Sequence, residues 1–225
     1  GATTGTAVAI TGSTIVNQLG TGKTTLSGTN TYTSTTTVSA GELVVNGTAS
    51  SSSFTVDGGT LSGSGSIGAL TIDDGGTLAP GTSPGTLNAG ATIFNGGGSF
   101  QWEINDADGS VGTNYDFLNI TGGLTITATN IDPFIIAITS LTAGDVGGLT
   151  SNFDSASDYS YTIATASTGI IGFSADKFNL NTDNFTNTIT GTWSIGVDGN
   201  NLNLSYAGSA VPEPGTYAAL FGLAA

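Results

Sequence analysis

A short phrase that begins with glycine recurs in the middle of this chain and constrains its fold more than any other feature. The phrase reads Gly-Gly-Thr-Leu or a close variant, and its first three occurrences lie about 17 residues apart. It occupies residues 41–43, 58–61 and 75–78, and a compressed copy occupies 85–87. Each glycine suits a turn through positive φ, and a short alternating β-prone run follows. A turn and a strand repeated at a fixed step predict a solenoid whose coils bury their apolar faces by stacking.

The composition supports ordered β structure. Glycine accounts for 36 of the 225 residues, and only 8% of the residues are charged. β-branched and aromatic residues occur throughout the chain, whereas a disordered chain lacks them. The length is sufficient to bury a substantial core, and the absence of cysteine excludes disulfides and thiolate chemistry. We therefore predict an all-β solenoid.

The charge is strongly negative. The chain carries 16 acidic residues against two basic ones, which gives a formal net charge of −14. A protein that binds a phosphate backbone needs clusters of Lys and Arg, so nucleic acid is excluded as a partner. An anionic membrane surface is disfavoured for the same reason, whereas divalent cations are attracted.

Residues 20–25 (GTGKTT) invite comparison with a phosphate-binding loop. That motif needs a glycine where Asn17 stands, with an apolar strand before the loop and a helix after it. Neither flanking pattern is present here. We therefore interpret Lys23 as a residue of a surface turn.

The polar loop 105–109 (NDADG) is the one candidate metal site. Clustered carboxylates attract hard cations such as calcium, but an EF-hand would place Ile104 at its first ligand position, so that motif fails. A looser calcium site formed by Asp106, Asp108 and Asp116 is one prediction, and an exposed acidic turn is the alternative. No other cofactor is predicted.

The C-terminal third differs from the repeats. Asp198-Gly199 is a strong hairpin signal, so we expect antiparallel closing strands that cap an open end of the solenoid. The predicted organisation is solenoid repeats at 1–127, closing β coils at 128–208 and a sorting or assembly tail at 209–225. The apolar run at the end of the tail is shorter than the about 20 residues that span a bilayer.

Three segments resemble the autotransporter-associated β-strand repeat. They are residues 26–33 (LSGTNTYT), 37–47 (TVSAGELVVNG) and 78–87 (LAPGTSPGTL), within a resemblance that covers roughly residues 24–127. Residues 161–173 and 198–202 resemble the closing coils of such passengers. The resemblance implies a right-handed parallel β-helix that is secreted or displayed on the surface of a Gram-negative-type bacterium. A start at Gly1 without Met agrees with removal of a signal peptide.

The tail resembles a PEP-CTERM sorting signal. Pro212, Glu213 and Pro214 form the motif, and an apolar run follows it. In that family the motif precedes a membrane segment and is processed outside the cell. The resemblance therefore implies transient membrane anchoring through the tail.

The favoured function is that of a non-enzymatic extracellular structural protein. Repetitive strands, few charges and few reactive side chains suit a subunit that assembles with itself into a surface fibre or matrix. When an apolar tail docks on a neighbouring copy, the contact is head-to-tail and does not form a closed ring, so it produces filaments. The predicted interface residues are Tyr217, Leu220, Phe221 and Leu223.

An adhesin or carbohydrate-binding protein is the alternative, with extracellular polysaccharide as its partner. Tyr32, Tyr159, Tyr161 and Trp193 would stack on sugar rings if they were exposed along one face. At alternating strand positions, however, aromatic side chains more often belong to the core.

A polysaccharide-cleaving enzyme is disfavoured. The chain has no His or Arg, so only Lys23 or Lys177 could act as a basic residue. A hydrolase needs two carboxylates that face each other, whereas Asp73 and Asp74 are consecutive and point to opposite faces of a strand. No catalytic residue is predicted.

Overall fold

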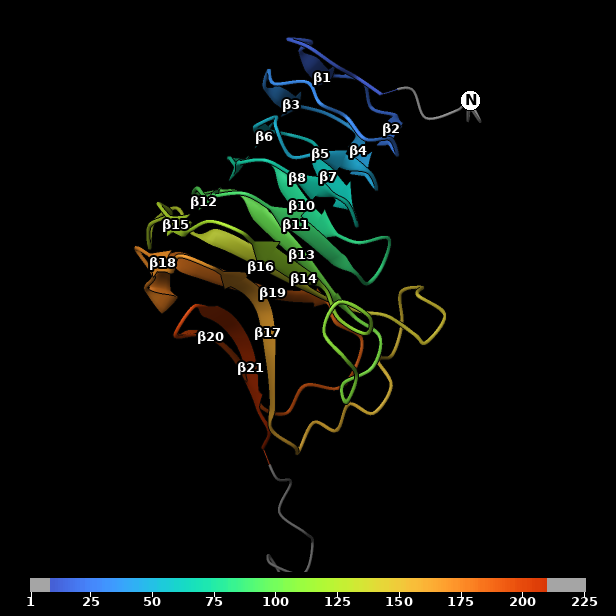
Figure 1. The fold of residues 1–225 in the computed structure, drawn as a ribbon. Helices are drawn as coiled ribbons and strands as arrows, with labels where there is room; N and C mark the ends of the chain where they lie inside the picture. The colour runs from blue at the N-terminus through green and yellow to red at the C-terminus, as the bar shows by residue number, and fades with distance from the viewer. Residues whose placement is uncertain (1–8, 210–225) are drawn as a thin grey trace, which may run out of the picture.

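The computed structural model describes residues 9–209, which form three largely parallel sheets wound into one β-helix (Figure 1). Sheet A consists of β1 (Val16–Gln18), β3 (Thr36–Val38), β6 (Phe54–Val56), β9 (Leu70–Ile72), β12 (Thr92–Phe94), β15 (Leu124–Ile126) and β18 (Ile170–Ile171). Sheet B consists of β2 (Lys23–Leu26), β4 (Glu42–Val45), β7 (Thr60–Gly63), β10 (Thr77–Pro80), β13 (Ser99–Ile104), β16 (Phe134–Ser140) and β19 (Phe178–Asn184). Sheet C consists of β5 (Thr48–Ala49), β8 (Ser66–Ile67), β11 (Thr86–Ala89), β14 (Phe117–Ile120), β17 (Tyr159–Ala166), β21 (Asn201–Ala207) and β20 (Thr192–Asp198).

The strands alternate between the sheets in chain order, so each full coil contributes one strand to each sheet. A short 3-10 helix, Ala175–Lys177, precedes β19. No helix among the described residues is long and apolar enough to cross a membrane. The predicted parallel β-helix is confirmed.

The leucine of each glycine phrase explains why the coils stack. In sheet B, Leu43, Leu61, Leu78, Phe100 and Ile136 are register partners on successive strands. All five side chains are fully buried. The column is therefore continuous through the core, and each coil covers the apolar face of the next.

The compressed phrase at 85–87 belongs to a different sheet. It begins β11 of sheet C, where Leu87 pairs with Leu118, rather than adding a strand to sheet B. Its step from the preceding phrase is about ten residues, which at about 3.3 Å per residue is too short to complete another coil. The phrase thus specifies a turn followed by a strand, and it does not specify which sheet that strand joins.

The glycines of the phrases serve two different purposes. Gly41 and Gly75 have positive φ values of 61° and 75°, as the pattern predicts. Gly58 does not, but a Cβ atom at this position would lie 2.7 Å from the carbonyl oxygen of Ser39 in the preceding coil. Close stacking of backbone on backbone, as well as turn geometry, therefore requires glycine.

Gly63 combines both demands, so we predict that Gly63→Ala destabilises the coil stack by at least about 2 kcal/mol. Its φ is 107°, and an added Cβ would lie 2.3 Å from the carbonyl oxygen of Val45. Denaturant unfolding measures the loss. Gly196→Ala is the matched control, because nothing lies within 4 Å of a Cβ at that strand position. Equal midpoints for the two variants would contradict the prediction.

An antiparallel hairpin closes sheet C, as the Asp198-Gly199 signal predicts. β20 pairs antiparallel with β21 from Asp198↔Asn201 outward, and β21 pairs antiparallel with β17. Gly199 takes the positive φ of 56° that the turn requires. Figure 1 shows this hairpin at the end of the stack remote from β1. The predicted antiparallel closing strands are confirmed.

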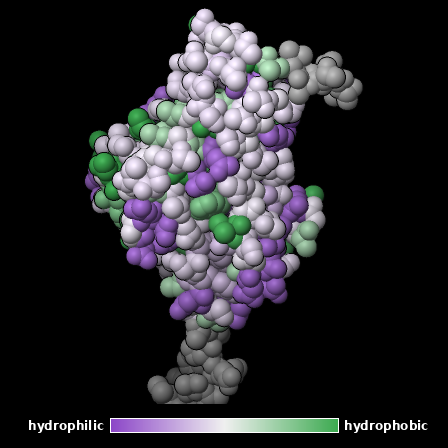
Figure 2. Space-filling view, in the orientation of Figure 1, coloured by the Kyte–Doolittle hydropathy of each residue, from purple (hydrophilic) through white to green (hydrophobic). Residues whose placement is uncertain are grey.

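The surface is mostly of intermediate hydropathy. Figure 2 shows hydrophobic residues gathered along one edge of the visible face, over β12, β15 and β18. The exposed large side chains include Ile131 and Ile171, with exposed fractions of 89% and 67%. The predicted sorting motif and tail interface, residues 212–223, lie outside the described residues.

Candidate functional site

Asp116 forms a buried junction immediately before β14. Its side chain is fully buried, and its carboxylate accepts hydrogen bonds from the backbone N–H groups of Gly85 at 2.7 Å and Glu103 at 3.0 Å. The indole Nε1 of Trp102 donates to the backbone carbonyl of Asp116 at 2.9 Å. One residue therefore joins the turn before β11, strand β13 and strand β14.

Burial governs the ionisation of this carboxyl group. Removal from water, reinforced by the neighbouring Glu103 carboxylate, raises the pKa of Asp116 well above its ordinary value. The two backbone donors act in the opposite direction, because they stabilise the charged form. The direction of the shift shows that desolvation dominates.

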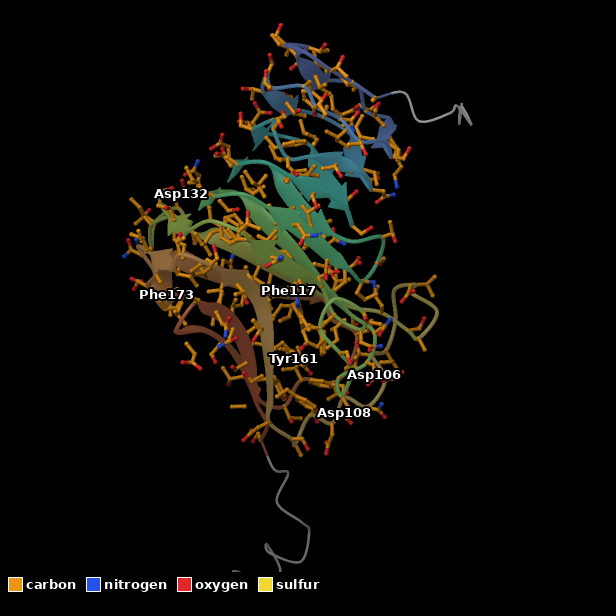
Figure 3. The ribbon with its side chains drawn as sticks, viewed as in Figure 1. Asp106, Asp108, Phe117, Asp132, Tyr161 and Phe173 are labelled. Carbon is orange, nitrogen blue, oxygen red and sulfur yellow. The ribbon has the colours of Figure 1, made fainter. Side chains whose placement is uncertain are left out.

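Asp106 and Asp108 lie elsewhere, on the loop that follows β13. Figure 3 shows both among the loops that project from one side of the coils. The Oδ1 atom of Asp106 accepts hydrogen bonds from the Asp108 N–H at 3.1 Å and from Nδ2 of Asn152 at 2.9 Å. Asp108 is exposed.

The three acidic residues of the predicted calcium site are therefore not brought together. Within residues 9–209, no three Asp, Glu, His or Cys side chains form a group that could hold a metal ion. The physical reason is that the Asp116 carboxylate points inward to backbone donors, whereas Asp106 closes its own loop. The geometry gives no support to a shared cation site at these residues.

The aromatic residues considered for sugar stacking are mostly core residues. Tyr32, Tyr161 and Trp193 are 0%, 3% and 8% exposed, which confirms the expectation that such strand positions face inward. Tyr159 is partly exposed, and its hydroxyl donates to the carbonyl of Asn152 at 3.0 Å. Burial raises the pKa of Tyr161, whose hydroxyl donates to the carbonyl of Ala107 at 3.2 Å.

Tyr159, Tyr161 and Trp193 belong to one aromatic cluster beneath the projecting loops, and Tyr32 does not. The ring centroids of Trp102 and Tyr161 are 5.2 Å apart, and those of Trp193 and Tyr206 are 5.1 Å apart. Phe153 stacks on Tyr159 at 5.3 Å. The cluster stabilises the C-terminal coils and anchors the loops, so it does not present a row of aromatic rings to solvent.

A groove of about 390 Å³ lies on the outward face of sheet B. Outward residues of β2, β4, β7, β10 and β13 line it together with the loop that follows β10. The lining residues are Lys23, Glu42, Val44, Thr60, Ser62, Ala79, Pro80, Gly81, Thr82, Ser83, Gln101 and Glu103. We name this feature the sheet B groove.

Lys23 is the first residue of strand β2 and follows the bend that ends at Gly22, so it does not belong to the predicted surface turn itself. No helix begins at Lys23, which agrees with the absence of a phosphate-binding loop. Its ammonium group pairs with the Glu42 carboxylate, with 2.9 Å between Nζ and Oε2. The Lys23 side chain is 62% exposed and that of Glu42 is 31% exposed. The pair forms one end of the sheet B groove.

The two glutamates of the sheet B groove are held by different partners. Glu42 also accepts a hydrogen bond from the Ser62 hydroxyl at 2.7 Å. Glu103 accepts from Nε2 of Gln101 at 2.8 Å and from the Ser83 hydroxyl. The sequence pattern did not single out either glutamate as a site residue, although the outward positions of both in alternating runs could have indicated them.

The separation of these glutamates limits their chemistry. Glu42 and Glu103 lie on strands three steps apart, which is about 14 Å at about 4.8 Å per step. The register adds four residues along the strands, or about 13 Å. Glycosidases place their two carboxyl groups about 5 to 10 Å apart. The pair is therefore unsuited to concerted acid and base catalysis.

Comparison with known proteins agrees with the fold. Residues 16–45 match the family described as passenger-associated-transport-repeat, and they span β1 to β4. A stretch of 92 residues is 36% identical to an extracellular serine protease of Serratia marcescens. The stretch represents 40% of this chain and 9% of that protein, so the chain spans a small part of that relative's length.

The matched residues 16–45 overlap the beginning of the predicted repeat region, residues 24–127. The predicted resemblance to autotransporter-associated repeats is confirmed over this segment, and the structure has the β-helical architecture that the repeat implies. The resemblance of the tail to a PEP-CTERM signal stays a prediction.

Proposed function

We propose that this chain is a non-enzymatic structural domain, secreted or displayed on the surface of a Gram-negative bacterium, which assembles with itself into a fibre or matrix. The passenger-associated repeat and the identity to an extracellular protein of Serratia marcescens support the location. The stacked coils support the structural role, because rigidity in a solenoid comes from the backbone ladder and needs no reactive side chain.

The observation that best supports self-assembly is that the edge strands of sheets A and B, among the described residues, lack a neighbour on one side. Within residues 9–209, β1 and β2 at one end of the stack, and β18 and β19 at the other, each have a neighbouring strand on one side only. Such edges present N–H and C=O groups that can pair with a strand of another chain. In sheet C the edge strands are β5 and β20, and β20 is the outer strand of the antiparallel hairpin, so we assign the head-to-tail contact to the parallel sheets A and B.

The tail supplies a second proposed contact. Its apolar residues Tyr217, Leu220, Phe221 and Leu223 would dock on a neighbouring copy, and such an open contact propagates into a filament. Its Pro-Glu-Pro motif, residues 212–214, would provide transient membrane anchoring before assembly. Both roles rest on the sequence pattern.

Absence of catalysis rests on the geometry of the sheet B groove. The separation of Glu42 and Glu103 exceeds the span of a glycosidase pair, and Lys23 is already paired with Glu42. The adhesin alternative loses its first support because Tyr32, Tyr161 and Trp193 are buried.

Electron microscopy of the purified chain tests assembly, in the presence and absence of calcium. We expect uniform filaments from the full chain and folded monomers after deletion of residues 212–225. The edge variant Ile171→Lys is expected to shorten or abolish filaments, because a charged side chain on an edge strand opposes pairing. Ile93→Lys is the matched control, since it lies on the same outward ladder but on a strand with neighbours on both sides.

The outcomes separate the parts of the proposal. Monomers from the full chain would contradict self-assembly. Normal filaments from the deleted chain would contradict the role of the tail. Equal loss of filaments in both lysine variants would indicate lateral association of sheet A faces rather than head-to-tail pairing of edges.

A further inference from the structure

The sheet B groove has a chemistry that a scaffold does not require. We propose that it binds a neutral extracellular oligosaccharide, which is a function beyond the structural role proposed above. Shape, hydrogen-bonding capacity, apolar floor and charge each support this class of ligand.

The shape of the groove fits a chain of sugar rings. Its floor runs across five neighbouring strands of sheet B, from β2 to β13, which is about 19 Å at about 4.8 Å per strand step. The loop formed by residues 81–83 after β10 makes a wall. A long, open groove accommodates several rings in a row, whereas a single small molecule favours a closed cavity.

The polar groups are positioned before a ligand arrives. Glu42 is held by Lys23 and Ser62, and Glu103 is held by Gln101 and Ser83. A carboxylate has about four lone-pair sites, so each glutamate retains about two for hydroxyl groups of a ligand. Because these side chains are already ordered, little conformational entropy is lost when the ligand binds.

The floor between the two glutamates is partly apolar. Val44, Ala79 and Pro80 line it, and Ala79 is the most exposed of the three, because Val44 and Pro80 are buried. The hydroxyl groups of Thr60 and Thr82 lie beside them. A pyranose ring has a C–H face and a rim of hydroxyl groups, so it matches a small apolar floor with acceptors and donors at its sides.

Charge selects neutral sugars over acidic ones. The groove carries two carboxylates in a chain of net charge −14, and its one ammonium group is neutralised by Glu42. Uronate or phosphate groups would therefore be repelled. A calcium ion could not bridge the two glutamates, because their strands lie about 14 Å apart.

Isothermal titration calorimetry with the full chain tests the proposal. The probes are soluble β-1,4-linked oligosaccharides of glucose, xylose and mannose, with oligogalacturonate as the acidic counterpart. We expect binding of at least one neutral probe, and weakening by about tenfold in each of two variants. Glu42→Gln exchanges one acceptor oxygen for an NH₂ donor, and Gln101→Ala removes an amide group. The midpoint of thermal unfolding should stay unchanged in both variants.

Thr71→Ala is the control variant, because Thr71 lies on the outward face of sheet A, outside the groove. It should bind like the unmodified chain. Failure of every neutral probe to bind at millimolar concentration would overturn the proposal, as would binding of oligogalacturonate alone. Equal weakening by Thr71→Ala would also overturn it. None of these results depends on whether the chain forms filaments.

Discussion

Replacement of Asp116 by alanine is expected to lower the free energy of unfolding by about 2 to 4 kcal/mol. The substitution removes both acceptors of a buried carboxylate and leaves the N–H groups of Gly85 and Glu103 without partners. A buried donor without a partner costs about 1 to 3 kcal/mol. Denaturant unfolding, monitored by tryptophan fluorescence, measures the loss.

Asp116→Asn and Asp57→Ala are the matched controls. The asparagine retains one acceptor but presents an NH₂ group to the second N–H donor, so its loss of stability should be smaller than that of alanine. Asp57 is exposed, and its replacement should change the free energy of unfolding by less than about 0.5 kcal/mol. If Asp116→Ala were as stable as the unmodified chain, the hydrogen bonds of Asp116 would not stabilise the fold as we propose.

The same residue predicts a pH dependence. Burial raises the pKa of Asp116 in the folded state above its ordinary value of 3.8, so the folded state retains a proton that the unfolded state has lost. The contribution of this group to stability is therefore full below its unfolded pKa and declines as the pH rises through the folded pKa. Asp116→Asn lacks this decline.

The difference in unfolding free energy between the unmodified chain and Asp116→Asn should thus shrink as the pH rises from about 3.5. Measuring the difference between the two chains cancels the contributions of the other carboxylates. A difference that grows with pH would mean that the two backbone donors outweigh desolvation, and the direction of the shift would be wrong.

Trp102→Ala is expected to destabilise the protein by about 3 to 5 kcal/mol. The side chain is fully buried and contacts Tyr115, Tyr161 and Trp193, with ring centroids 5.9, 5.2 and 6.4 Å away. Its removal leaves a cavity where β13 meets the aromatic cluster, and the surrounding coils cannot collapse into it freely.

Trp102→Phe separates packing from hydrogen bonding. Phenylalanine retains most of the aromatic surface but loses the bond from Nε1 to the Asp116 carbonyl, so a loss of about 1 to 2 kcal/mol is expected. Because Trp102 and Asp116 share contacts, the losses of Trp102→Phe and Asp116→Asn should not add. Strict additivity in this double-mutant cycle would contradict the claim that Trp102 and Asp116 act as one unit. So would a Trp102→Ala variant as stable as the unmodified chain.

The sequence by itself determined the repeat and the fold class. The glycine phrases and their leucines specify turns and inward positions at a fixed step, and this information is local, so the solenoid, the buried column through Leu43 and Leu61, and the hairpin at Asp198-Gly199 could all be predicted. The burial of Tyr161 and Trp193 followed from the same alternation of strand positions.

Only the tertiary structure decided which side chains meet across coils. Asp106, Asp108 and Asp116 are close in sequence, but one is exposed and another is fully buried, because the chain direction between them reverses through a loop. Glu42 and Glu103 are distant in sequence, yet both line the sheet B groove, because stacking places outward residues of successive coils on one face. The register from β10 to β13 lies beyond the repeated phrase, and no local pattern encodes it.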